Sequence, residues 1–235
     1  MEKLPLFVVV SFMLTTAVTL FFLYKAAHYN KKILLVSIVW LCMQAALGLS
    51  KFYTVTGGNP PRFALLLLPP LLCITLVFIT KTGRRFIDGL SPKTLTLLHT
   101  VRLPVELTLL WLAAHKYVPQ LMTFEGRNFD VLSGLSAPFI FYFGYVRKTL
   151  GKGFLLGWNL LCSALLLNIV VNAVLSAPLP FQRFAFDQPN IALLYFPFVW
   201  LPSFIVPAVL LSHLACLRQL VMSKQQAYSL TKGTA

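Results

Sequence analysis

Three polar residues inside an apolar stretch of the chain are the first candidates for chemistry. His99, Arg102 and Glu106 lie between Leu90 and His115, in a run that is otherwise apolar enough to cross a bilayer. Their spacing places them on one face of a helix, and Arg102 and Glu106 have the spacing of an ion pair. A charge at the bilayer centre costs roughly 2.5 to 3.5 kcal/mol, so such residues usually face a bundle interior and mark functional sites. A ligand, proton or substrate site is therefore our first interpretation, and a structural buried ion pair is the alternative.

Two further histidines extend this set toward one side of the membrane. His213 lies in the last apolar run, five residues before Arg218, and His28 lies at the end of the first run. Neutral imidazoles near a carboxylate are suited to zinc or iron, and two histidines on facing helices could ligate haem. Because no HxxxH or ExxH pair occurs on one helix, we expect no metal and no cofactor. The alternative is a metal or haem site formed by His28, His99 and His213.

A second set of polar residues is expected nearer to the opposite, outer side. Asn168 and Asn172 share a helix face, and Gln44 lies near the middle of another apolar run. Buried amides in membranes often join helices, for about 0.6 kcal/mol each, which favours a structural role. If they line a pocket instead, a nearby loop supplies its polar mouth, formed by Glu125, Arg127, Asn128 and Asp130.

The composition is that of an integral membrane protein. Hydrophobic residues make up 58% of the chain and charged residues 11%, with a mean hydropathy of +0.79. The net charge of +14 comes from bases in short clusters between apolar runs, which favours a role in topology over nucleic-acid binding. The cysteines lie in apolar runs without metal-ligand spacing, so we expect small buried side chains at Cys42, Cys73, Cys162 and Cys216.

Seven apolar segments are long enough to cross a membrane. They cover approximately residues 4–27, 33–53, 62–81, 95–115, 131–148, 154–177 and 191–217. The first has no small-x-small cleavage site at its end, so we interpret it as a span rather than a signal peptide. The sequence therefore predicts an all-α membrane protein with seven transmembrane helices in a single domain over residues 1–222, followed by a short cytoplasmic tail over 223–235.

The distribution of bases predicts the orientation. With seven spans, thirteen of the 20 Lys and Arg residues lie on the side of the C-terminus and six on the side of the N-terminus, while Arg102 lies within a span. The positive-inside bias then places the N-terminus outside and the C-terminus in the cytoplasm. The expected location is a bacterial inner (plasma) membrane.

A weak internal repeat is also visible. Residues 61–69 align without gaps on residues 189–197, with Pro, Ala, Leu, Leu and Pro identical, and residues 32–42 align more weakly on 152–162. These matches suggest parallel repeats over 4–81 and 131–217, joined by a connector helix over 95–115. Chance similarity between leucine-rich helices is the alternative.

This plan of three spans, one connector and three spans resembles that of the small seven-helix sugar transporters, the PQ-loop proteins and the microbial rhodopsins. We do not expect retinal to be bound as a Schiff base, because the segment 191–217 contains no lysine. The single Pro119-Gln120 pair lies at the outer end of the fourth segment rather than once in each triplet. We therefore assign no family from the sequence.

Prolines interrupt several expected spans and point to a transporter-like interior. They are Pro69, Pro70, Pro104, Pro138, Pro197, Pro202 and Pro207. Each removes a backbone donor and frees a carbonyl that a neighbour or cavity water must satisfy. Broken helices around a polar interior are typical of transporters and ligand-binding bundles.

Familiar catalytic motifs are absent from the sequence. It has no GxSxG, HExxH, Walker or GxGxxG motif, and the small run Ser133–Ser136 favours close helix packing. We predict a small-molecule or proton-coupled carrier or ligand-binding bundle, which is compatible with a homo-oligomer. The alternatives are an intramembrane enzyme that acts on a lipid or isoprenoid-like substrate by acid-base chemistry, and a non-catalytic accessory protein. The expected partners are the bilayer and a small-molecule or lipid ligand, and no nucleic acid.

Overall fold

The computed structural model describes residues 4–58 and 61–232, and within these ranges it contains helices and no strand. The α-helices are α1 (Leu6–Ala26), α2 (Lys31–Leu49), α3 (Ala64–Ile79), α4 (Lys81–Asp88), α5 (Pro92–Leu98), α6 (Arg102–Ala114), α7 (Val131–Ile140), α8 (Lys152–Leu175) and α9 (Val206–Lys232). The π-helical segments are η4 (Phe141–Val146) and η6 (Leu201–Ile205), and the 3-10 turns are η1 (Phe52–Thr54), η2 (His99–Val101), η3 (Gln120–Met122) and η5 (Ala192–Leu194). The all-α prediction is confirmed. Lys3, one of the bases used to predict the orientation, lies outside the described residues.

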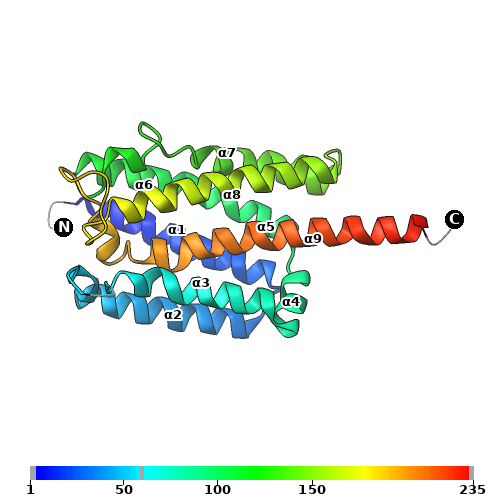
Figure 1. Ribbon diagram of the computed structural model, residues 1–235, viewed down its shortest axis with the longest axis horizontal. Coiled ribbons are helices and arrows are strands. Elements are labelled where there is room, and N and C mark those ends of the chain that lie inside the picture. The colour runs from blue at the N-terminus through cyan, green and yellow to red at the C-terminus, as the bar shows by residue number, and fades with distance from the viewer. Residues whose placement is uncertain (1–3, 59–60, 233–235) are drawn as a thin grey trace.

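The long helices lie roughly along one common axis and form a bundle (Figure 1). α9 packs against α3, α4, α5 and α8, while α1 packs against α2, α5 and α6. The largest group of buried apolar side chains lies among α1, α6, α8 and residues 192–205, which precede α9. α1 begins at one end of the bundle, and α9 extends beyond its neighbours at the other (Figure 1).

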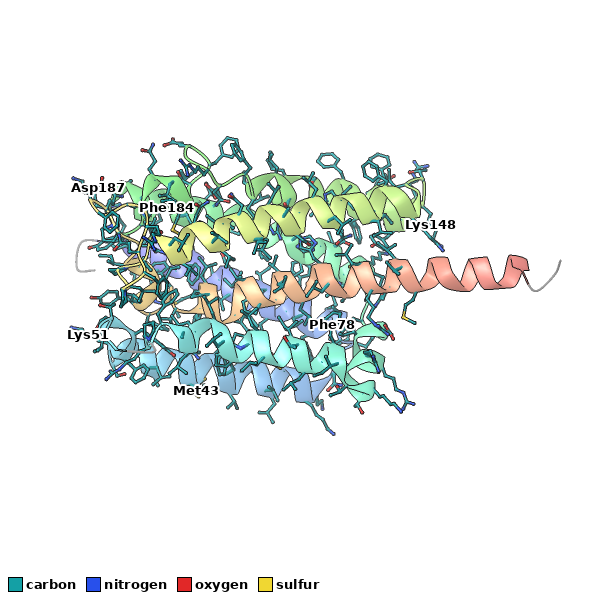
Figure 2. The ribbon with its side chains drawn as sticks, viewed as in Figure 1. Met43, Lys51, Phe78, Lys148, Phe184 and Asp187 are labelled. Atoms are coloured by element: carbon teal, nitrogen blue, oxygen red, sulfur yellow. The ribbon has the colours of Figure 1, made fainter. Side chains whose placement is uncertain are left out.

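Residues that the sequence analysis places on opposite sides of the membrane lie at opposite ends of the bundle. Lys51 and Asp187 lie at the end where the chain begins, and Lys148 lies at the other end (Figure 2). Five helical stretches of the described residues are long and apolar enough to cross a membrane, namely α1, α2, Pro92–Ala114, α8 and Leu201–Met222. Several possible spans are thus present, while the count of seven, the topology and the repeat stay predictions.

Two of the seven predicted spans differ from simple crossings. α3 and α4 pass the same test only when taken together, and the chain bends by 92° between them. At the bend, Thr80 is extended and its hydroxyl accepts a hydrogen bond of 3.2 Å from the N–H of Gly83, which caps α4. α7 and η4 together cover only Val131–Val146, a shorter apolar helix.

The last long helix begins ten residues later than predicted. The sequence predicts a span over 191–217, whereas the helical stretch begins at Leu201 and residues 191–199 form a 3-10 turn and further turns. Tyr195 is extended, with φ −119° and ψ 147°. Pro197 explains the correction, because proline lacks an N–H and disfavours a helical residue before it. Pro202 lies in the first turn of the helical stretch, where its missing N–H is tolerated.

The two segments that align best in the internal repeat differ in secondary structure. Residues 64–69 lie in α3, whereas the aligned residues 192–197 form the turn η5 and then leave it in an extended conformation. The sequence identity between these segments therefore does not extend to their secondary structure.

Two of the four cysteines correct the expectation of burial. Cys162 and Cys216 are buried, but Cys42 and Cys73 are exposed. Their helices α2 and α3 present apolar outer faces, on which Leu35 is 63% and Leu72 61% exposed. Because a bilayer is as apolar as a protein core, periodicity alone does not separate the outer face of such a helix from its inner face.

The fourth predicted span is continuous but irregular at its middle. Ser91 caps α5 by accepting a hydrogen bond from the N–H of Thr94, and Pro92 occupies the first turn. The turn η2 follows α5 and precedes Pro104, which has no N–H for the carbonyl of Thr100. This irregular turn carries His99 and leads into the polar residues of α6.

Candidate functional site

The polar residues of the fourth predicted span point into the bundle, as their spacing predicted. His99 on η2 is 0% exposed, and Arg102 and Glu106 on α6 are each 4% exposed. α7 approaches this part of the chain closely at Gly134, where a Cβ atom would lie 3.2 Å from the Cβ of Arg102. The small-residue run of α7 therefore packs against the site, in agreement with the sequence analysis.

Arg102 is the centre of a buried polar network. Its Nη1 donates to Oδ1 of Asp130 at 2.6 Å, forming an ion pair, and lies 3.5 Å from the carbonyl oxygen of Cys162. Its Nη2 lies 2.8 Å from Nε2 of His213 on α9. The guanidinium of Arg102 on α6 thus contacts three other segments: Asp130 just before α7, helix α8 and helix α9.

The hydrogen bonds of His213 define its tautomer. A guanidinium has only donors, so Nε2 of His213 must accept from Arg102. The proton of the neutral ring is then on Nδ1, which donates to Oδ1 of Asn159 at 2.9 Å. Asn159 is held in turn by a bond of 2.9 Å from its Nδ2 to the carbonyl of Leu155. Both nitrogens of His213 are therefore engaged.

His99 stacks on this network without joining its hydrogen bonds. Its ring centroid lies 3.9 Å from that of His213, with an angle of 17° between the rings, and Trp158 contacts both rings edge-on. Neither nitrogen of His99 has a hydrogen-bond partner among the described residues. A buried polar group without a partner costs about 1 to 3 kcal/mol, and such groups are often retained for function.

The expected ion pair between Arg102 and Glu106 is not formed. Arg102 turns to Asp130, while Glu106 accepts hydrogen bonds from the backbone N–H of Phe124 and, at 2.6 Å, from Nδ2 of Asn128. A partner from another segment replaces the helical neighbour, because the loop after α6 folds back over the site. Both contacts of Glu106 are neutral donors, so its carboxyl group has no cationic partner among the described side chains.

A cavity of about 60 Å³ opens beside these groups. Its polar wall consists of Arg102, Glu106, Asn128 and Asp130. Its remaining wall is apolar and comes from α3, α8 and the segment that begins α9, with lining residues such as Leu67, Ile169 and Val206. Such a cavity holds a few water-sized molecules and is amphiphilic.

The loop residues predicted to form a polar mouth divide into two groups. Asn128 and Asp130 are buried and belong to the site, with the N–H of Asp130 donating to Oδ1 of Asn128 at 3.1 Å. Glu125 and Arg127 are exposed, and Glu125 accepts a bond of 3.3 Å from Gln120. Of these four loop residues, only Asn128 and Asp130 therefore line the cavity.

The amides that the sequence predicts for the outer half form hydrogen bonds of a structural kind. Asn168 donates to the carbonyl of Arg127 at 2.8 Å and accepts from Asn172 at 3.3 Å. Gln44 accepts a bond of 2.6 Å from the hydroxyl of Tyr53. These bonds fix loops to helices, and none of the three amides lines the cavity beside Glu106.

His28 does not join the other two histidines. Its Nε2 lies 3.0 Å from the carbonyl oxygen of Gly89, where the residue is exposed. Within the described part of the chain, no group of three or more His, Cys, Asp or Glu side chains could hold a metal ion. His213 offers no free lone pair in this arrangement, since Nε2 accepts from Arg102.

Two residues of the site were not selected from the sequence. Asn159 orients His213, and Trp158 packs against both histidines. Asn159 was visible as an amide within an apolar segment, the same signal that singled out Asn168. Trp158 carried no such signal, because tryptophan is common in membrane helices.

Comparison with known proteins identifies a family without assigning a function. Residues 60–221 match a family described as "Domain of unknown function (DUF8737)". The match covers more than half of the chain, so the protein belongs to this family. No curated protein and no solved structure matches the chain. The matched range includes the whole polar network around Arg102.

Proposed function

We propose that this protein binds a proton or a small amphiphilic cation at the cavity beside Glu106, as a carrier or ligand-binding bundle of the membrane. One observation carries the proposal: the cavity places Glu106 next to the Arg102–Asp130 ion pair. The charges of the pair cancel, so the carboxyl group of Glu106 is left as the uncompensated acid of the wall. A proton or a protonated amine complements it, and the apolar wall suits a hydrocarbon group.

His99 supports a role for protons. It is a wholly buried imidazole that has no hydrogen-bond partner among the described residues, and it stacks on His213, which belongs to the network centred on Arg102. Ionisable side chains within membrane helices commonly form proton pathways. We assign Glu106 the role of proton or cation acceptor, with His99 as a second group able to accept a proton.

We further propose seven crossings of a plasma membrane, with the N-terminus outside. The excess of bases on the side of Lys148 supports this orientation. In intact cells, a membrane-impermeant maleimide should label Lys51→Cys, and it should label Lys148→Cys only after permeabilisation. The reverse pattern would contradict the orientation.

Ligand binding is tested with two matched series of probes. Short alkylamines and alkyl carboxylates of the same length are added to the purified protein, and the melting temperature is measured. The amines should raise it, because a ligand that binds only the folded state stabilises that state. Glu106→Gln should remove this response, whereas Glu125→Gln, in the exposed part of the loop, should retain it. Stabilisation by carboxylates alone would overturn the charge argument.

Transport is tested on the same protein in liposomes. A trapped pH-sensitive dye should report proton movement, driven by an imposed pH gradient or by addition of the stabilising amine. Glu106→Gln should abolish the signal, and Glu125→Gln should preserve it. Amine binding without any flux would leave a ligand-binding bundle and exclude a carrier.

An intramembrane enzyme is the second candidate. The orientation of His213 by Asn159 favours it, since a base held by a third group is typical of acid-base catalysis. It ranks second because Nε2 of His213 already accepts from Arg102 and is not open to a substrate. Conversion of a lipid or isoprenoid substrate in detergent, without flux in liposomes, would favour the enzyme.

A further inference from the structure

A second cavity lies on the other side of the α3–α9 contact and differs in character from the first. It has a volume of about 260 Å³ and is lined by α1, α2, α3, η6 and the beginning of α9. Pro69 and Pro70 of α3 face Pro207 of α9 across it. Prolines distort the backbone and prevent the two helices from packing in a regular way, which accounts for a hollow at this place.

The lining of this cavity contains no charged side chain. The indole N–H of Trp40 donates a hydrogen bond of 2.9 Å to the carbonyl of Ser203. The hydroxyl of Ser203 donates one of 2.7 Å to the carbonyl of Val199. An apolar cavity of about 150 Å³ stays dry and takes up a benzene-sized hydrocarbon. The present cavity, of about 260 Å³, is lined mostly by apolar side chains, with Ser37 and Ser203 as its hydroxyl-bearing residues, and is therefore suited to hydrocarbon rather than to water.

The cavity continues onto the outer face of α2. Val36 and Trp40 line both the cavity and a shallow hollow that also involves Leu35, Val39 and Met43. Val36 is 67% exposed and Val39 60% exposed on this face. A flexible chain lying along α2 can thus pass Trp40 and enter the cavity without crossing a polar surface.

We infer that this cavity is a binding site for one acyl chain of a membrane phospholipid. The chain lies along the hollow of α2, passes Trp40 and ends between the prolines of α3 and α9. The head group stays at the membrane surface, so the site recognises the hydrocarbon chain and not the head group. This site is separate from the proposed cation site and does not rest on it.

The position of the acyl chain brings it close to the polar cavity. Leu201, Pro202 and Val206 line the cavity beside Glu106, whereas Phe204 and Pro207 line the apolar cavity. One turn of distorted helix, η6, thus separates the two sites. An acyl chain in the apolar cavity supports η6 from the side opposite to Glu106.

The test uses a phosphatidylcholine with a diazirine group in one acyl chain. The full-length protein in nanodiscs with a trace of this lipid is irradiated, and the labelled residues are mapped by mass spectrometry. Labelling should concentrate in 69–74 and 204–211 relative to Leu14, which is 61% exposed on α1 and reports ordinary contact with lipid. Even labelling of all exposed apolar faces would overturn the inference.

Matched variants separate the cavity from the surface around it. Ala208→Phe and Ser37→Phe add a ring inside the cavity from two different helices, and labelling of both stretches should fall to the level of Leu14. Leu72→Phe adds the same ring to the outer face of α3 and should leave labelling unchanged. Glu106→Gln should also leave it unchanged, so failure of the cation site and failure of the lipid site are distinguishable. Unchanged labelling in both cavity-filling variants would refute the site.

A measurement on the unmodified protein covers the case in which the filling variants do not fold. Cys73 lines the cavity, whereas Cys42 is an exposed thiol that does not. Phospholipid added to detergent-solubilised protein should slow the reaction of Cys73 with N-ethylmaleimide more than that of Cys42. Equal protection of both thiols, or protection of Cys73 by a polyprenyl alcohol alone, would overturn the assignment to a phospholipid.

Discussion

Arg102 and Asp130 are 28 residues apart in the sequence and form a buried ion pair, with 2.6 Å between Nη1 and Oδ1. The side chains are 4% and 12% exposed. Taking two charges out of water is costly, and the pair is tolerated because each charge compensates the other. The consequence is that either residue alone is harmful to the fold when its partner is removed.

Arg102→Met should destabilise the protein by about 3 to 5 kcal/mol, because it leaves the carboxylate of Asp130 buried and uncompensated. The double variant with Asp130→Asn should recover most of this loss. The free energy of unfolding in detergent measures both effects. Arg127→Met, on the exposed loop residue, is the control and should stay within about 0.5 kcal/mol of the unmodified protein. Equal instability of the single and double variants would show that the guanidinium acts through its other contacts.

The sequence predicted which face of the fourth span is buried but not which partners it meets. Burial of His99, Arg102 and Glu106 follows from their spacing, because the faces of a helix are a local property. The partners of Arg102 depend on how α7 and α9 pack, and His213 is 111 residues away. No local pattern encodes such a contact, so the i,i+4 pairing of Arg102 with Glu106 was preferred and was wrong.

The boundaries of the spans show a similar limit. The apolar segments of the sequence predicted the position of every long helix of the described residues. This worked because the hydrophobicity of a span is summed over about 20 residues and tolerates single exceptions. The beginning of the last helix was misplaced because residues 191–200 are as apolar as a span but contain Pro197 and precede Pro202. Backbone chemistry, rather than hydrophobicity, decides where that helix starts.

The tautomers of two histidines should be opposite. His213 accepts at Nε2 from Arg102, so its proton is on Nδ1, whereas His28 donates from Nε2 to the carbonyl of Gly89. Nitrogen-15 NMR of histidine-labelled protein in nanodiscs should therefore show a protonated Nδ1 for His213 and a protonated Nε2 for His28. Asn159→Ala should broaden or shift the signals of His213 and leave those of His28 unchanged. A proton on Nε2 of His213 would contradict the contact with Arg102.

The contact between α4 and α9 should weaken in acid. Hydrogen bonds from Arg218 to both carboxylate oxygens of Asp88, at 2.7 and 2.9 Å, lower the pKa of Asp88. A carboxylate with a lowered pKa stabilises the fold above its unfolded pKa of about 3.9, and this contribution disappears as the pH falls through the folded pKa. Asp88 is exposed, so the contribution at pH 7 should be at most about 1 kcal/mol.

Asp88→Asn measures this contribution. The difference in free energy of unfolding between the unmodified protein and the variant should be present at pH 7 and should shrink toward zero as the pH falls through the lowered pKa of Asp88. Asp187→Asn, in an exposed loop at the other end of the bundle, is the control for general effects of charge. A difference that grows on acidification would contradict the role of Arg218.

Trp40 satisfies a carbonyl that a proline leaves without its helical donor. The regular partner of the Ser203 carbonyl is the N–H of residue 207, which is a proline, and the indole N–H of Trp40 occupies that place at 2.9 Å. Trp200 makes the reciprocal contact, donating to the carbonyl of Leu41 at 2.9 Å. α2 and the η6 segment are thus joined in both directions at the depth of the apolar cavity.

Trp40→Phe should therefore cost about 1 to 3 kcal/mol beyond its loss of packing, since it leaves the Ser203 carbonyl unpaired in an apolar environment. In a Pro207→Ala background the same change should cost less, because alanine supplies the missing N–H. The coupling between the two substitutions, from the free energies of unfolding of the four variants, isolates this contribution from packing. Trp111→Phe provides the control, as it removes an indole from α6 and should show no coupling to Pro207→Ala. If the two backgrounds respond equally to Trp40→Phe, the indole contributes only packing, and η6 is held by its apolar contacts alone.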